Sequence, residues 1–74
     1  MSRLDEDILD ALRISHSPQK RVRLILMKDP YQPVPPGTEG TVESVDDMGT
    51  VQVRWDTGSG LGLIYGEDEW IVIT

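Results

Sequence analysis

Residues 46–60 read DDMGTVQVRWDTGSG, and this stretch decides the fold class. In its middle, Val51, Val53 and Trp55 alternate with polar residues, which is the period of a β-strand with one buried face. The Asp-rich cluster before these residues and the Gly-rich cluster after them both suit tight turns. The stretch therefore predicts a strand from Thr50 to Trp55 with a turn at each end.

Glycines mark the turns of a β-meander. Gly49, Gly58 and Gly66 are spaced nine and then eight residues apart, as expected for short antiparallel strands joined by tight turns. The apolar residues after these turns predict two further strands, the fourth with Leu61, Leu63 and Tyr65 and the fifth from Ile71 to Ile73.

The strand before Gly49 has an irregular pattern. Val42 and Val45 are three residues apart, and a period of two cannot place them on one face of a strand. An extra residue in the strand would restore the pattern, so we expect a β-bulge near Glu43 or Ser44.

A first strand precedes a proline-rich loop. Val22, Leu24 and Leu26 occupy alternate positions, which is the pattern of a strand. The loop from Lys28 to Gly37 follows and contains four of the five prolines. Since proline lacks an amide donor, this loop is not expected to pair as a central strand.

Five short strands in so few residues predict a mainly β fold. Closing them into a small five-stranded barrel would remove exposed sheet edges. We expect the barrel in residues 20–74, after a helix and linker in residues 1–19. The predicted core comprises Val22, Leu24, Val42, Val51, Val53, Trp55, Leu61, Leu63 and Ile71.

The N-terminal residues have the period of an amphipathic helix, from Ser2 to about Ser15. Ser2 is the expected N-cap, with Asp5 completing a capping-box-like pair. An isolated helix of this length is marginal in water, so its apolar stripe must pack on something. We favour an open end of the barrel over a second copy or a partner. The stripe comprises Leu4, Ile8 and Leu12.

The composition indicates a cytoplasmic domain. The chain has 74 residues and no cysteine, so it forms no disulfide framework and tolerates a reducing compartment. Its apolar runs fall far short of the roughly 20 residues of a membrane helix. The acidic N-terminus is unlike a secretion signal. We therefore expect no contact with a membrane.

The charge is uneven along the chain. The net charge is −6, and residues 38–74 carry eight acids and Arg54 as their only basic residue. This acidity disfavours a nucleic acid as ligand and favours a partner with a basic surface, although acidity for solubility explains it equally well. The one basic cluster lacks neighbouring aromatic platforms and a positive field, so we do not expect it to bind nucleic acid. It comprises Lys20, Arg21, Arg23 and Lys28.

Several motifs occur together in about the last three quarters of the chain: PPGTEGTV at 35–42, VDDMGT at 45–50, VRWDTGS at 53–59 and LGLIYGED at 61–68. In these motifs the chain resembles a bacterial family of SH3-like domains, classed as a domain of unknown function and frequent on plasmids, phages and integrative elements. The resemblance covers about Lys20 to Thr74 and leaves the helix outside. It implies a mobile-element setting and a small SH3-like barrel, to which the residue pattern adds the N-terminal amphipathic helix. It implies no catalytic residue and no ligand.

The aromatic residues near the last turn are candidates for partner binding. Tyr31, Tyr65 and Trp70 could together line a shallow groove beside an acidic turn, in the manner of SH3-like barrels that bind peptides. The alternative is that these rings seal the end of the barrel. The acidic residues of the turn complete the candidate site, and they are Glu67, Asp68 and Glu69.

The sequence offers little that could perform catalysis. His16 is the only histidine, and we expect it to be an exposed linker residue without a positioned partner. The acidic pairs near Asp46 and Asp68 lack calcium-loop spacing and are expected to form turns. The Gly37 to Gly40 segment lacks the features of a phosphate-binding loop and is expected to be a tight turn. We therefore expect neither an enzyme, nor a metal, nor a cofactor.

These features predict a small non-catalytic protein-interaction module encoded on a mobile genetic element. The alternative is an acidic phage or plasmid inhibitor of a host defence nuclease, which would imitate nucleic acid in the manner of an anti-CRISPR protein. A basic-patch nucleic-acid binder is the third hypothesis.

Overall fold

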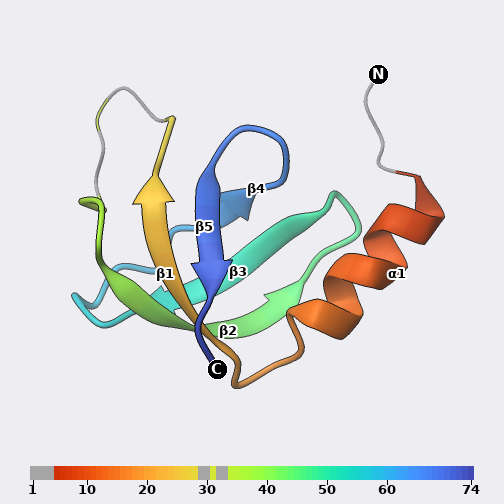
Figure 1. Ribbon diagram of the computed structural model, residues 1–74, viewed down its shortest axis with the longest axis horizontal. Coiled ribbons are helices and arrows are strands. Elements are labelled where there is room, and N and C mark those ends of the chain that lie inside the picture. The colour runs from red at the N-terminus through yellow and green to blue at the C-terminus, as the bar shows by residue number, and fades with distance from the viewer. Residues whose placement is uncertain (1–4, 29–30, 32–33) are drawn as a thin grey trace.

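The structure is a computed structural model that describes residues 5–28, 31 and 34–74. The strands of the described part form one antiparallel sheet in the order β4-β3-β2-β1-β5 (Figure 1). The fold is therefore mainly β, as predicted. Its elements are α1 (Glu6–Ser15), β1 (Arg21–Leu26), β2 (Glu39–Val45), β3 (Thr50–Trp55), β4 (Leu63–Ile64) and β5 (Glu69–Val72).

The sheet is not closed into a barrel. Among the described residues, β4 pairs with β3 and β5 pairs with β1, so β4 and β5 are the two edges. β4 has only two residues, so it offers no edge long enough to pair along β5. The predicted barrel is thus an open, curved sheet.

Two bulges interrupt the regular pairing of the strands. The register of β2 with β3 shifts between Val42 and Ser44, which confirms the bulge predicted at this point. A second shift lies between Leu24 and Leu26 of β1, where it faces β5. This second bulge was not predicted. It leaves Leu26 44% exposed and brings Met27, which is 3% exposed, into the core.

The turn between β2 and β3 has the predicted form. Gly49 has a left-handed φ of 83°, and its amide donates to the Asp46 carbonyl at 3.0 Å. One carboxylate oxygen of Asp46 accepts from the amides of Met48 and Thr50, each at 2.9 Å. Asp46 is therefore a turn former, as its sequence context indicated.

The core contains every predicted residue except Ile71, with Leu61 partly buried. Ile71 lies opposite Arg23 and is 45% exposed, whereas Trp70 lies opposite Leu24 and packs against the core. The core prediction for β5 is wrong because the residue that faces the core is Trp70, one position before Ile71. The buried core comprises Val22, Leu24, Met27, Val34, Val42, Val51, Val53, Trp55 and Leu63.

Trp55 is the largest side chain of this core, and Gly40 makes room for it. The two residues are opposite each other in β2 and β3, and the Trp55 indole donates to the Leu61 carbonyl at 2.7 Å. A Cβ atom at Gly40 would lie 2.9 Å from the Trp55 ring and 2.6 Å from a methyl group of Val53. The prediction that Gly40 belongs to a tight turn is wrong, since it lies within β2. Only Gly37, with a φ of 90°, lies in the turn.

The helix is shorter than predicted and presents a different face to the sheet. Asp5 is the N-cap rather than the third helical residue, and its side chain accepts from the Asp7 amide at 2.8 Å. The buried residues are Leu9 and Leu12, whereas Ile8 is 37% exposed. Ser2 and Leu4, which the prediction assigned to the helix, lie outside the described residues.

α1 packs on the sheet of its own chain, beside β2, through a face that differs from the predicted stripe. Arg13 adds an ion pair from the helix to Asp47 in the β2–β3 turn, at 2.6 Å. This pair is exposed, so it contributes little to the free energy of unfolding. No helix in the described part of the chain has the length and apolar character needed to cross a membrane.

A methyl group at position 40 tests the packing around Trp55. Gly40→Ala should lower the free energy of unfolding by about 1–3 kcal/mol, because β3 and the indole must shift to admit a Cβ atom. Gly60→Ala is the control, since a Cβ atom there meets nothing within 4 Å. Urea unfolding of both variants measures the difference, and an equal effect of the two substitutions would contradict this account of the core.

Candidate functional site

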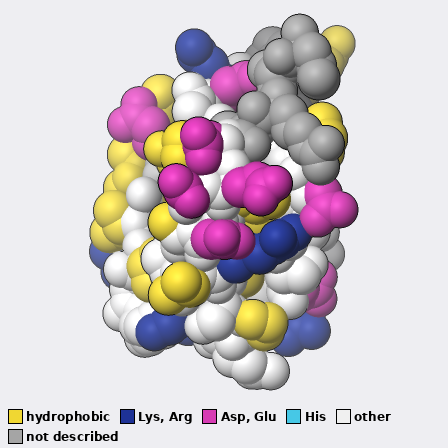
Figure 2. Space-filling view, turned by 90° about the vertical axis from the view of Figure 1, so that its right-hand side faces the viewer, with side chains coloured by type: hydrophobic (Ala, Val, Ile, Leu, Met, Phe, Trp, Pro, Cys, Tyr) yellow, Lys and Arg dark blue, Asp and Glu magenta, His cyan; other side chains and the backbone are white. Residues whose placement is uncertain are grey.

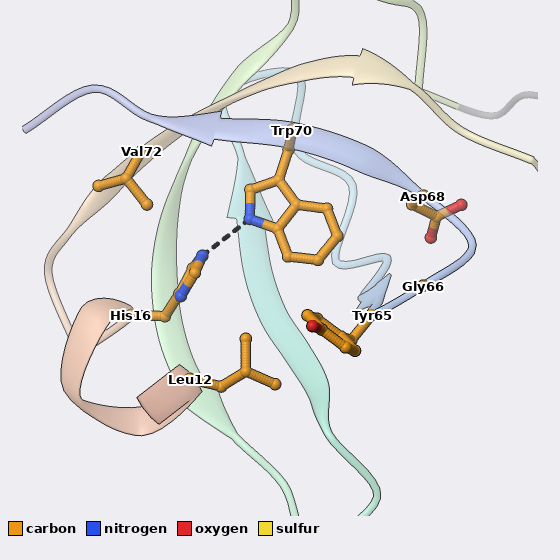
Figure 3. A pocket seen from close by; sticks show the side chains of 7 residues that line it. All are labelled: Leu12, His16, Tyr65, Gly66, Asp68, Trp70 and Val72. Atoms are coloured by element: carbon orange, nitrogen blue, oxygen red, sulfur yellow. Dashed lines mark hydrogen bonds between the residues drawn. The ribbon is translucent and has the colours of Figure 1, made fainter. Parts of the chain in front are cut away.

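A hollow of about 290 Å³ lies between the end of α1 and β5, and we call it the α1–β5 hollow. Figure 3 shows side chains from three segments around it: the helix end, the β4–β5 turn and β5. The lining is mainly apolar and aromatic, which is typical of surfaces that bind ligands. It comprises Leu12, His16, Tyr65, Gly66, Asp68, Trp70 and Val72.

A hydrogen bond between His16 and Trp70 forms one wall of the hollow. The Trp70 indole nitrogen donates to Nε2 of His16 at 2.8 Å (Figure 3). The two rings meet edge to face, with centroids 5.7 Å apart and an interplanar angle of 74°. His16 is only 8% exposed. The prediction of an exposed linker histidine is therefore wrong, because the imidazole joins the helix end to β5.

The hydrogen bonds determine the protonation state of His16. An indole N–H can only donate, so Nε2 of His16 must be the acceptor and carries no proton. The proton of the neutral ring is then on Nδ1, which lies 2.9 Å from the Ser15 hydroxyl. That hydroxyl donates in turn to the Ala11 carbonyl at 2.8 Å. Each polar group in this series of hydrogen bonds thus has a partner when the imidazole is neutral.

Burial lowers the pKa of His16 below its ordinary value of 6.5, because removal from water disfavours the charged imidazolium. A hydrogen bond with the Leu12 carbonyl opposes this effect in part. Within the folded protein the histidine therefore stays neutral to a lower pH than in the unfolded chain.

Asp68 holds the β4–β5 turn in place. One of its carboxylate oxygens accepts from the Lys28 amide and the other from the Ile64 amide, each at 2.9 Å. Its own amide donates to the Ile64 carbonyl at 3.0 Å. Both carboxylate oxygens are thus used to join the turn to the end of β1, as expected for a turn-forming acid.

The structure distributes the predicted site residues over two neighbouring hollows. Tyr65 and Trp70 line the α1–β5 hollow, whereas Tyr31 and Glu67 line a second hollow of about 360 Å³. Asp68 borders both of them. Glu69 is exposed and begins β5. The three aromatic side chains of the predicted groove therefore do not meet in one hollow.

Four residues that line the α1–β5 hollow were not predicted as site residues, and they are Leu12, His16, Gly66 and Val72. A signal for His16 does exist in the sequence. Leu9, Leu12 and His16 are three and then four residues apart, so His16 continues the buried face of the helix. Because histidine is polar, we did not assign it to the buried face of the helix.

The acidic residues of the C-terminal half are largely engaged within the chain. Arg21 binds both carboxylate oxygens of Asp56, at 2.8 and 2.6 Å, and this interaction lowers the pKa of Asp56. Arg23 binds Glu39 at 2.9 Å. Within the described part of the chain, four of the eight acids in residues 38–74 pair with arginine, namely Glu39, Glu43, Asp47 and Asp56, and Asp46 and Asp68 accept from backbone amides.

α1 presents a second group of acidic side chains to solvent. Asp5, Glu6, Asp7 and Asp10 are all exposed. Figure 2 shows acidic side chains gathered on the face of the molecule that carries this helix. The helix therefore presents exposed carboxylates in addition to those of the C-terminal half.

The fold and the site together define a small mainly β domain with an N-terminal helix docked on an open sheet. The chain belongs to the family described as Domain of unknown function (DUF4314), whose model matches residues 5–73. The match begins at the N-cap of α1, so the helix is part of the family pattern, which is wider than the resemblance over Lys20 to Thr74 implied. Comparisons with curated proteins and with solved structures found no match.

The neutral state of His16 makes stability dependent on pH. The pKa of His16 is lower in the folded than in the unfolded chain. At a pH between these two pKa values, the unfolded chain therefore binds more protons than the folded chain. The free energy of unfolding should therefore fall as the pH is lowered from about 7.5 through the unfolded pKa of about 6.5.

His16→Gln tests this dependence, because a glutamine oxygen can accept from Trp70 but does not titrate. Urea unfolding at pH 7.5 and pH 5.5 should show a smaller loss of stability for this variant than for the wild type. Equal losses in the two proteins would mean that His16 is not held neutral by the fold.

Proposed function

We propose that this protein is a non-catalytic protein-interaction module that receives an apolar or aromatic side chain of its partner in the α1–β5 hollow. The observation that carries the proposal is the lining of that hollow. Aromatic and apolar side chains from three segments surround an open volume of about 290 Å³, and Tyr65 is 45% exposed at its border. Interface hot spots are enriched in tryptophan and tyrosine, and they lie in well-packed pockets of the interface.

The use of His16 supports a role without catalysis. It is the only histidine of the chain, and its two ring nitrogens are engaged by Trp70 and Ser15. A general base needs a free nitrogen within reach of a substrate proton, and this imidazole has none while it supports the helix.

Within this proposal the domain is an SH3-like barrel that remains open on one side. The meander from β1 to β4 and the return of β5 to the side of β1 support this assignment. The bulges in β1 and β2 supply the bends that a barrel-like sheet needs. The resemblance to bacterial SH3-like domains supports a setting on a mobile genetic element, and the lack of cysteine supports the cytoplasm.

An acidic inhibitor that imitates nucleic acid is the second candidate function. The exposed acids of α1 favour it, since they form an anionic surface on one face of the molecule (Figure 2). The ion pairs of Arg21 and Arg23 weigh against it, because they neutralise C-terminal carboxylates that such a mimic would present. The interaction module is therefore the function that the structure supports best.

Peptides selected from a random 12-residue display library on the immobilised protein provide the test. Tyr65→Ala should weaken their binding about tenfold or more, the effect expected when a hot-spot aromatic is truncated. Tyr31→Ala is the matched control, because Tyr31 is 88% exposed and borders the other hollow. Calorimetric titration gives the affinities. Selected peptides that bind wild type and Tyr65→Ala equally would exclude the α1–β5 hollow as the contact surface.

A further inference from the structure

β5 is an edge strand, and its pairing with β1 determines which of its backbone groups face outward. In β1, the amide of Leu24 donates to Thr38 and its carbonyl accepts from Gly37, so this residue bonds away from β5. The neighbouring odd-numbered residues of β1 therefore face β5. The hydrogen bond from the Ile73 amide to the Arg21 carbonyl, at 2.9 Å, shows this directly.

The same alternation applies to β5. Because Ile71 lies opposite Arg23 in the register, Ile71 and Ile73 bond to β1. Trp70 and Val72 then direct their amide and carbonyl groups to the free side of β5. These two residues are also the ones whose side chains line the α1–β5 hollow.

The free edge of β5 has only part of the usual protection against strand addition, namely its shortness, the bulge in its pairing with β1 and the exposed Glu69. Natural sheets also shield their edges with lysine, proline or a covering segment. Residues 69–74 contain no lysine and no proline. Among the described elements, α1 has its backbone beside β2 and not beside β5. The backbone groups of Trp70 and Val72 are thus placed to pair with another strand.

We propose that the partner binds as an extended segment that adds to the free side of β5 and forms main-chain hydrogen bonds with Trp70 and Val72. This inference rests on the proposed function, because the same hollow receives a side chain of the segment. In a strand, alternate side chains point to opposite faces. A residue on the inner face therefore enters the hollow, and its neighbours lie beside Ile71, which is 45% exposed.

The charges at the start of β5 specify the partner further. Glu67 and Glu69 are exposed there. A lysine or arginine near this end of the segment would complement them. A second copy of this chain fits less well, since it carries the same net charge of −6 and has no basic residue after Arg54 to offer from its own β5. The partner is therefore an extended segment of another protein, apolar at its inward position and basic near Glu69.

Val72→Pro tests the main-chain bonds, with Val72→Ala as its control. Both substitutions remove the valine side chain, but only proline removes the outward amide, and proline is tolerated on the free side of an edge strand. The probe is a library-selected peptide that depends on Tyr65. Val72→Pro should bind it about tenfold or more weakly than Val72→Ala, since a main-chain hydrogen bond is lost and its acceptor is left without a partner. Equal affinities would overturn the proposal.

Amide hydrogen exchange of the wild-type protein gives an independent readout that needs no variant to fold. On addition of the peptide, the amides of Trp70 and Val72 should become protected. Those of Ile71 and Ile73 should change little, because they are already bonded to β1. Peptide binding that depends on Tyr65 without protection of Trp70 and Val72 would overturn strand addition and leave the proposed function intact. Protection that grows with protein concentration alone would assign the edge to a second copy and overturn the proposal.

Discussion

The hydrogen bond from Trp70 to His16 is the interaction on which the arrangement of helix and sheet depends. The sheet is open between its edge strands, and α1 has only two buried side chains, Leu9 and Leu12, to hold it in place. A helix of this length is marginal by itself. The bond at 2.8 Å ties the end of the helix to β5, and the backbone of the helix lies beside β2. The helix thereby covers part of the side that an unclosed sheet leaves open.

This arrangement also creates the candidate site. In a closed barrel, the two edge strands β4 and β5 would pair, and backbone hydrogen bonds would occupy the region between them. Here the same region is bordered by Tyr65, Trp70 and the helix end, which leaves a hollow of about 290 Å³ beside an unpaired edge. The side chain of His16, which supports the end of the helix, is thus also a wall of the site. A change in the protonation of His16 would alter stability and the shape of the hollow together.

The sequence predicted those features of the fold that depend on local periodicity and turn chemistry. The alternation of Val51, Val53 and Trp55 and the irregular step in β2 follow from the period of a strand, and the structure confirms both. Barrel closure could not be predicted, because it depends on the length of β4 rather than on a pattern. The site was predictable only in part. Tyr65 and Trp70 stand beside a turn signal, whereas His16 acquires its role from a partner 54 residues away.

The tautomer of His16 is the most direct test of this account. Long-range proton–nitrogen correlation spectra at pH 7.5 distinguish the two nitrogens of an imidazole. We expect a neutral ring with its proton on Nδ1, an unprotonated Nε2, and an indole proton of Trp70 that is slow to exchange with water. A proton on Nε2, or the averaged signals of a ring free in solvent, would contradict the docking of the helix through this bond.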